Sequence, residues 1–155
     1  MSYGNVYVAH VAFGAKDQHT VHAFHEAESF RGPSLLIAYS HCIAHGYDLA
    51  FGLEQQKLAV QSGSWPLYRF DPRRAAEGES PLQLDSGAPN GRLADYFRNE
   101  ARFRMVEAEN PARFKRLLGA AEREIARRFR LYEEIARIRP EADAPRIGSP
   151  ASGAS

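Results

Sequence analysis

The sequence predicts a partial α/β domain with a parallel sheet, followed by a helical C-terminal extension. Two short apolar runs flank a segment with helical periodicity, which is the pattern of a β-strand, helix, β-strand unit. The second half of the chain shows mainly helical spacing. We therefore expect a partial α/β domain over residues 1–92, a helical extension over 93–139 and a disordered tail over 140–155, which is rich in Pro, Gly, Ser and Ala.

The first predicted strand covers Asn5–Phe13, which is rich in β-branched and aromatic residues and ends at Gly14. A helix is expected to begin at about Asp17, a candidate N-cap, and to end near Phe30. Its apolar face would consist of Val21, Phe24 and Ala27. A strand that starts so close to Met1 is unusual, because a central strand without neighbours leaves backbone groups unpaired.

The segment Pro33–Gly46 contains the second predicted strand and the most informative residues of the chain. Its first half is a continuous apolar run, typical of a strand buried on both faces of a parallel sheet. Its second half is polar and carries Cys42, the only cysteine. Because ligands of open α/β sheets bind beyond the carboxyl ends of strands, Cys42 stands where a ligand or a nucleophile is expected.

The remaining elements follow from the same signals. A helix is expected over Tyr47–Gln61 and a third strand over Trp65–Phe70, placed near an edge or with Pro66 at its start. Asp71–Arg92, dense in Pro, Gly, Ser and Asp, predicts a long surface connection. Two helices complete the chain, over Leu93–Glu109 and, after the stop and start signal Asn110-Pro111, over residues 111–137.

Composition excludes several classes of function. A net charge of +1 gives no general attraction to nucleic acid or to acidic membranes. A single cysteine cannot form an internal disulfide, which fits a reducing compartment. The N-terminus shows no export signal or membrane anchor. We therefore expect a cytoplasmic protein without nucleic-acid or membrane partners.

Two groups of residues could hold a metal by their spacing. Cys42 with His41 and His45 gives a Cys-x-x-His pattern, but no second pair completes a zinc site, and a lone cysteine after a strand is commonly a small buried hydrophobe. His19, His22 and His25 recur every three residues and so drift by about 60° per step around a helix. Packing or solvation is the favoured role for these histidines.

The last predicted helix is basic. Residues 111–139 hold nine Lys or Arg and four Glu, a balance of 9 − 4 = +5. A solvated face with glutamate pairs four residues apart is the favoured interpretation, and docking of an acidic electron carrier is the lesser alternative. The sequence contains no phosphate-binding glycine loop, nucleophile elbow or cysteine pair, so no autonomous catalytic residues are identified.

Long motifs nevertheless resemble one family, pyruvate:ferredoxin (flavodoxin) oxidoreductase. The resemblance is strong over Ser2–Ser86 and loose up to Arg137. It is carried by five segments: Ser2–Ala15, Glu26–Gly46, Gly52–Val60, Gly63–Pro72 and Pro81–Ser86.

The resemblance implies that this chain corresponds to the C-terminal part of a thiamine-diphosphate-binding domain. Enzymes of the family decarboxylate pyruvate with thiamine diphosphate and Mg²⁺, form acetyl-CoA, pass electrons through iron–sulfur clusters to ferredoxin or flavodoxin, and act as homodimers. By position in the motif, Cys42 would be the fourth ligand of the [4Fe-4S] cluster nearest the thiamine. Ser40, His41 and His45 are the candidates for hydrogen bonding around that cluster.

The family's Mg²⁺-diphosphate motif and its other cluster cysteines correspond to positions upstream of this chain. The resemblance therefore implies a fragment, or a truncated reading frame, that works with the remainder of the oxidoreductase and is inactive and nearly free of cofactor alone. The alternative from another class is a stand-alone interaction module that binds an acidic partner through its basic helix.

Overall fold

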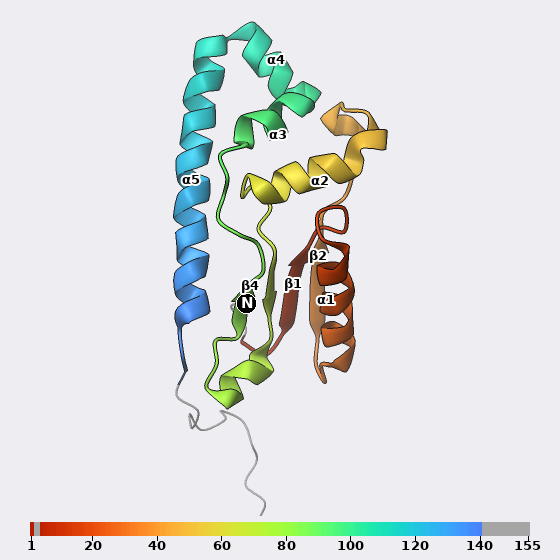
Figure 1. Cartoon of the computed structure of the whole chain (residues 1–155), viewed down its shortest axis with the longest axis vertical. Helices are drawn as coiled ribbons and strands as arrows, with labels where there is room; N and C mark the ends of the chain where they lie inside the picture. The colour runs from red at the N-terminus through yellow and green to blue at the C-terminus, as the bar shows by residue number, and fades with distance from the viewer. Residues whose placement is uncertain (2–3, 141–155) are drawn as a thin grey trace, which may run out of the picture.

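The computed structural model describes residue 1 and residues 4–140, and its core is a four-stranded sheet in the order β2-β1-β3-β4 (Figure 1). The strands are β1 Tyr7–Val11, β2 Ser34–Ala38, β3 Tyr68–Phe70 and β4 Leu82–Leu84. The expected α/β class with a helical extension is confirmed. The sheet is mixed, however, because β1 pairs in parallel with β2 but antiparallel with β3, which pairs antiparallel with β4. The predicted tail lies almost wholly in residues 141–155, outside the described residues.

The fourth strand lies inside the segment that the sequence predicted as a surface connection. That prediction was wrong for Leu82–Leu84, where Leu82 is only 1% exposed. Three residues are too few to show the alternating pattern of a strand. The strand becomes apparent only from its pairing with β3 in the structure. The third strand was expected near an edge or with Pro66 at its start. Strand β3 lies next to the edge strand β4, and it begins at Tyr68, so Pro66 precedes the strand.

Strand β2 was expected to be buried on both faces, and this prediction was wrong for the described chain. It forms one edge of the sheet, with Leu35 52% and Ile37 37% exposed. Of its apolar side chains, Leu36 packs against the core residues beneath α1. An apolar run indicates that a strand avoids water in its final surroundings, and this chain covers only part of β2.

Helix α1 (Asp17–Ser29) covers one face of the sheet, but with a different side from the expected one. Val21 and Phe24 are 51% and 57% exposed, whereas His19, Thr20 and Ala23 are buried. The reason is the charged Arg69 of β3, which bonds to Glu26 of α1 at 2.7 Å and turns the polar side of the helix toward the sheet. The N-cap is Lys16 rather than Asp17.

Helix α5 (Pro111–Arg137) covers the opposite face and has the predicted bounds. The Asn110 side chain accepts a hydrogen bond from the Arg113 backbone N–H at 2.9 Å, as the stop and start signal implied. Figure 1 shows α5 running along the length of the molecule beside β4. Its C-terminal half contributes Tyr132, Ile135 and Ala136 to an apolar cluster. The sheet residues of this cluster are Val8, Tyr68, Phe70 and Leu82.

Three further helices lie beyond one end of the sheet (Figure 1). They are α2 Gly52–Gln61, α3 Leu93–Asn99 and α4 Ala101–Glu109. The predicted single helix over residues 93–109 is wrong, because Glu100 has an extended backbone (φ −100°, ψ 130°) and separates α3 from α4. Short 3₁₀ turns complete the fold at Ile43–His45, Leu49–Phe51 and Pro72–Glu77. Within the described residues, the helices lack the combination of length and apolar character that crossing a bilayer requires.

Candidate functional site: the cysteine loop

The segment Tyr39–Asp48, called the Cys42 loop below, leaves the carboxyl end of β2. Cys42 is partly exposed, forms no disulfide and has an extended backbone (φ −144°, ψ 123°) directly before the 3₁₀ turn Ile43–His45. The turn ends at Gly46, whose φ of +69° is in the left-handed region that glycine adopts without strain. The loop therefore has one defined conformation that presents the cysteine beyond the strand end.

The three residues predicted to surround Cys42 lie in different environments. Ser40 is exposed and its hydroxyl donates to the His41 carbonyl at 3.2 Å. His41 packs its ring on Gly52 of α2, where a Cβ atom would stand 2.5 Å from the His41 Cε1 atom. His45 is turned inward, with its Nδ1 atom 3.8 Å from Glu100 Oε1. Their hydrogen bonding to a cluster stays a prediction.

The corner between α3 and α4 holds the Cys42 loop at several points. At the start of the loop, the Tyr39 and Tyr96 hydroxyls lie 3.1 Å apart. Near its end, the Gly46 carbonyl accepts hydrogen bonds from the Ala101 backbone N–H and from Arg104 Nη2, both at 3.3 Å. Residues that the sequence identified only as part of a helical extension thus determine where the loop lies.

Glu100 is the innermost residue of this corner, with a side chain that is 0% exposed. Its carboxylate accepts hydrogen bonds from Gln55 Nε2 at 3.1 Å and from Arg102 Nε at 2.6 Å. Gln55 is itself buried and also donates to the Tyr96 carbonyl at 3.0 Å. A buried carboxylate requires such partners, because without them its desolvation would be costly. Sequence reasoning missed Glu100, since nothing in a polar helical stretch marks one glutamate as buried.

Two buried polar atoms of the loop have no hydrogen-bond partner among the described residues: His45 Nδ1 and the Tyr47 hydroxyl. At 3.8 Å, His45 Nδ1 and Glu100 Oε1 are too far apart for a hydrogen bond. Burial, and then the proximity of Tyr39, Glu100 and Cys42, raises the pKa of Tyr47, so its hydroxyl keeps its proton as a potential donor. Buried polar atoms without a partner are uncommon in folded proteins, so these two atoms mark the loop as a place where a further polar group can be accommodated.

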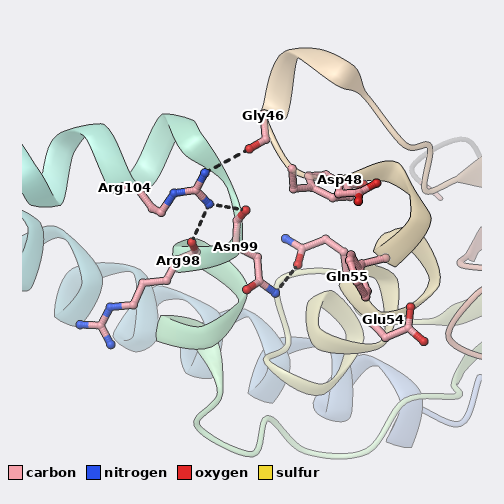
Figure 2. A pocket seen from close by; sticks show the side chains of 9 residues that line it. Gly46, Asp48, Glu54, Gln55, Arg98, Asn99 and Arg104 are labelled. Atoms are coloured by element: carbon pink, nitrogen blue, oxygen red, sulfur yellow. Dashed lines mark hydrogen bonds between the residues drawn. The ribbon is translucent and has the colours of Figure 1, made fainter.

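A polar hollow of about 490 Å³ lies between the Cys42 loop, α2 and the α3–α4 corner. In Figure 2, Arg104 reaches across it to the backbone carbonyls of Gly46 and of the end of α3, and Asn99 bonds to Gln55. The Arg98 side chain forms an ion pair with Glu107 at 2.7 Å. The arginines are thus engaged within the protein, and we interpret the hollow as part of the contact between the loop and the helices.

Cys42 can supply a single metal ligand. Within residues 4–140, no three His, Cys, Asp or Glu side chains are grouped so that they could hold a metal ion. A thiolate at a strand end suits a soft metal or an iron–sulfur cluster, and the two unpartnered donors suit its sulfur atoms. The residues therefore fit one corner of a cluster whose other ligands come from elsewhere.

The other candidate groups have structural roles. His19 Nε2 lies 3.0 Å from Asp85, and His22 Nε2 lies 3.4 Å from Glu26, which agrees with the favoured packing role. On α5, exposed arginines pair with glutamates at a spacing of three residues rather than the expected four: Arg127 with Glu124 and Arg137 with Glu134.

Fold and site together define an α/β segment that carries one free cysteine beyond a strand end. No family model matches the chain. It is 51% identical over 146 residues to a pyruvate-flavodoxin oxidoreductase of Rhodospirillum rubrum and 48% identical over 136 residues to one of Nostoc sp.. A pyruvate:ferredoxin oxidoreductase of Moorella thermoacetica is 40% identical over 136 residues.

These matches cover 94%, 88% and 88% of the chain. The predicted resemblance is confirmed: the chain is homologous to one segment of the pyruvate-flavodoxin oxidoreductases, which their names describe as redox enzymes. It spans 11–12% of the length of these relatives.

Proposed function

We propose that this chain acts as one segment of a cytoplasmic oxidoreductase that converts pyruvate to acetyl-CoA and reduces flavodoxin or ferredoxin. The 51% identity to a pyruvate-flavodoxin oxidoreductase supports this activity. The remainder of the oxidoreductase, a homodimer, supplies the sites for thiamine diphosphate and Mg²⁺. In this proposal the 155-residue chain is inactive on its own.

Within that enzyme Cys42 is a thiolate ligand of a [4Fe-4S] cluster. The observation that carries this assignment is its place beyond the end of β2, in a loop that also holds two buried polar atoms without partners among the described residues. The cluster, when bound, carries single electrons away from the site of decarboxylation. Cys42 would hold the cluster through its thiolate. The Tyr47 hydroxyl, which lies near Cys42, would be the donor for a hydrogen bond to sulfur, which stabilises the reduced state.

The open side of the sheet supports a role inside a larger protein. Leu35 and Ile37 of β2 are exposed, and Phe13, Val21 and Phe24 form an apolar surface at α1. Apolar surfaces of this kind commonly mark contacts with further protein. In this proposal, residues 1–92 complete the thiamine-diphosphate-binding domain and residues 93–139 support the Cys42 loop.

Replacing Cys42 with serine in the full-length oxidoreductase tests the ligand assignment. We expect the loss of one cluster, measured as about four fewer iron atoms per chain and the loss of one electron paramagnetic resonance signal on reduction. Ala44→Ser is the matched control, because Ala44 is exposed in the same loop and its variant should keep all iron. Unchanged iron and spectra in Cys42→Ser would contradict the assignment and favour the interaction-module alternative.

A further inference from the structure

We propose that Glu100 is a positioning residue that, from the α3–α4 corner, fixes the Cys42 loop and thereby the place of Cys42. The inference rests on the proposed role of Cys42 as a cluster ligand and extends it to a residue far along the chain. Glu100 lies 58 positions after Cys42 (100 − 42), so tertiary structure alone brings the two regions together.

The first step of the argument is the burial of Glu100. Its side chain is 0% exposed, and two donors, Gln55 Nε2 and Arg102 Nε, hold its two oxygens in place. Gln55 is fixed in turn by the Tyr96 carbonyl and by Asn99 Nδ2 at 2.9 Å. Because each partner is itself held, the carboxylate has little freedom to move.

The second step is the contact between this fixed carboxylate and the loop. Glu100 Oε1 faces His45 Nδ1 at 3.8 Å, and His45 is bonded through its backbone N–H to the Cys42 carbonyl at 3.1 Å. The next residue, Ala101, donates its backbone N–H to the Gly46 carbonyl. One break between two helices thus supplies a side chain and an adjacent backbone group to the same turn of the Cys42 loop.

The third step is the close approach at Gly46. A Cβ atom built on Gly46 would stand 2.5 Å from the Ala101 Cβ, well inside van der Waals contact, and its φ of +69° disfavours other residues. The loop therefore touches the start of α4 with no space between them. Displacing either side must move the turn that follows Cys42.

Amide hydrogen exchange of the full-length oxidoreductase, read by mass spectrometry on peptides covering residues 39–48, tests the contact. Gly46→Ala forces the loop away from Ala101 and should raise exchange of these amides about tenfold. Glu100→Gln keeps the shape but removes the charge, and should raise exchange by a smaller factor. Glu109→Gln, at an exposed position at the end of α4, is the matched control and should leave exchange unchanged.

A second measurement separates positioning from a merely structural role. In redox titrations of the same variants followed by electron paramagnetic resonance, Glu100→Gln should shift one cluster to a higher potential, because a buried negative charge that opposes reduction is gone. Gly46→Ala should change the line shape of that signal. Glu109→Gln should match the parent enzyme in both.

Unchanged exchange in both Gly46→Ala and Glu100→Gln would overturn the contact. Faster exchange with every cluster signal and potential unaltered would overturn the positioning of Cys42. Failure of the underlying assignment has a different signature, full iron content in Cys42→Ser, which leaves the exchange rates of the other variants unaffected.

Discussion

The two edges of the sheet differ in how completely this chain covers them. At the β4 edge, α5 packs on Leu82 and its neighbours, and Leu82 is 1% exposed. At the β2 edge, Leu35 is 52% exposed, and the outer side of α1 presents Phe24, 57% exposed. The more apolar strand is thus the less buried one, so β2 has the composition of a covered strand without a full cover in this chain.

The difference shows that an apolar run indicates the kind of surroundings in which a strand is stable. Those surroundings can include protein that is not part of the same chain. The short β4 gives a weak local signal, yet its neighbours bury Leu82 almost completely. Comparing the stability of variants in the 155-residue chain with that in the proposed full-length oxidoreductase can therefore test whether each edge of the sheet is covered by this chain alone.

The largest effect on stability is expected at Arg69, which links helix α1 to the segment after β4. It pairs with Glu26 of α1 at 2.7 Å and with Asp85, just after β4, at 2.8 Å. Arg69→Met would leave two mostly buried carboxylates without their arginine partner and should lower the free energy of unfolding by about 3–5 kcal/mol. Chemical denaturation of the 155-residue chain measures it.

Arg127→Met is the control, since it removes an arginine from an exposed pair with Glu124 and should leave the denaturation midpoint unchanged. Equal midpoints for the Arg69 and Arg127 variants would show that the ion pairs of Arg69 with Glu26 and Asp85 add no more to the free energy of unfolding than an exposed pair does.

A matched pair of leucines compares the edges directly. Leu82→Ala should lower the free energy of unfolding by about 2–5 kcal/mol, because it leaves a cavity under α5. Leu35→Ala, at the opposite edge, should change it by less than about 0.5 kcal/mol in the 155-residue chain. Thermal and chemical melts of both variants provide the values.

The same pair sharpens the comparison in the full-length oxidoreductase. If further protein covers β2 there, Leu35→Ala becomes clearly destabilising, since its side chain is then buried. A Leu35→Ala variant as harmless in the full enzyme as in the short chain would mean that this edge remains exposed.

The smallest effect concerns His10, in the centre of the sheet. Its Nδ1–H donates to the Pro66 carbonyl at 2.6 Å, and its ring stacks on Trp65 with centroids 3.8 Å apart. Burial lowers its pKa; the Pro66 hydrogen bond acts in the opposite direction, and the charge of Arg128 lowers the pKa further. The net result is a folded-state pKa below the usual value of about 6.5.

Because the unfolded chain binds a proton more readily than the folded one, stability is full above pH of about 6.5 and falls as the pH drops from there through the folded-state pKa. His10→Gln should remove this slope from a series of melts, whereas His25→Gln, at an exposed position, should retain it. An identical slope in both variants would refute the role of His10.

Local signals were sufficient for several parts of this protein. The β-branched run of β1, the helix Pro111–Arg137 with its Asn110 cap and the cysteine beyond β2 were all predicted from neighbouring residues, and the structure has each of them. Patterns of this kind depend on contacts within a few positions of each other, so the sequence shows them directly. The long motifs likewise identified the relatives before any geometry was known.

Tertiary structure alone decided which faces are covered and what supports the site. Helix α1 turns Glu26 inward because Glu26 pairs with Arg69 of β3. On the same side of the helix, His19 bonds to Asp85, which also accepts from Arg69. Glu100 interrupts a helical stretch because its buried carboxylate meets Gln55 and the Cys42 loop. Such contacts join residues more than 40 positions apart (69 − 26 = 43 and 100 − 55 = 45), where no periodicity in the sequence can indicate them.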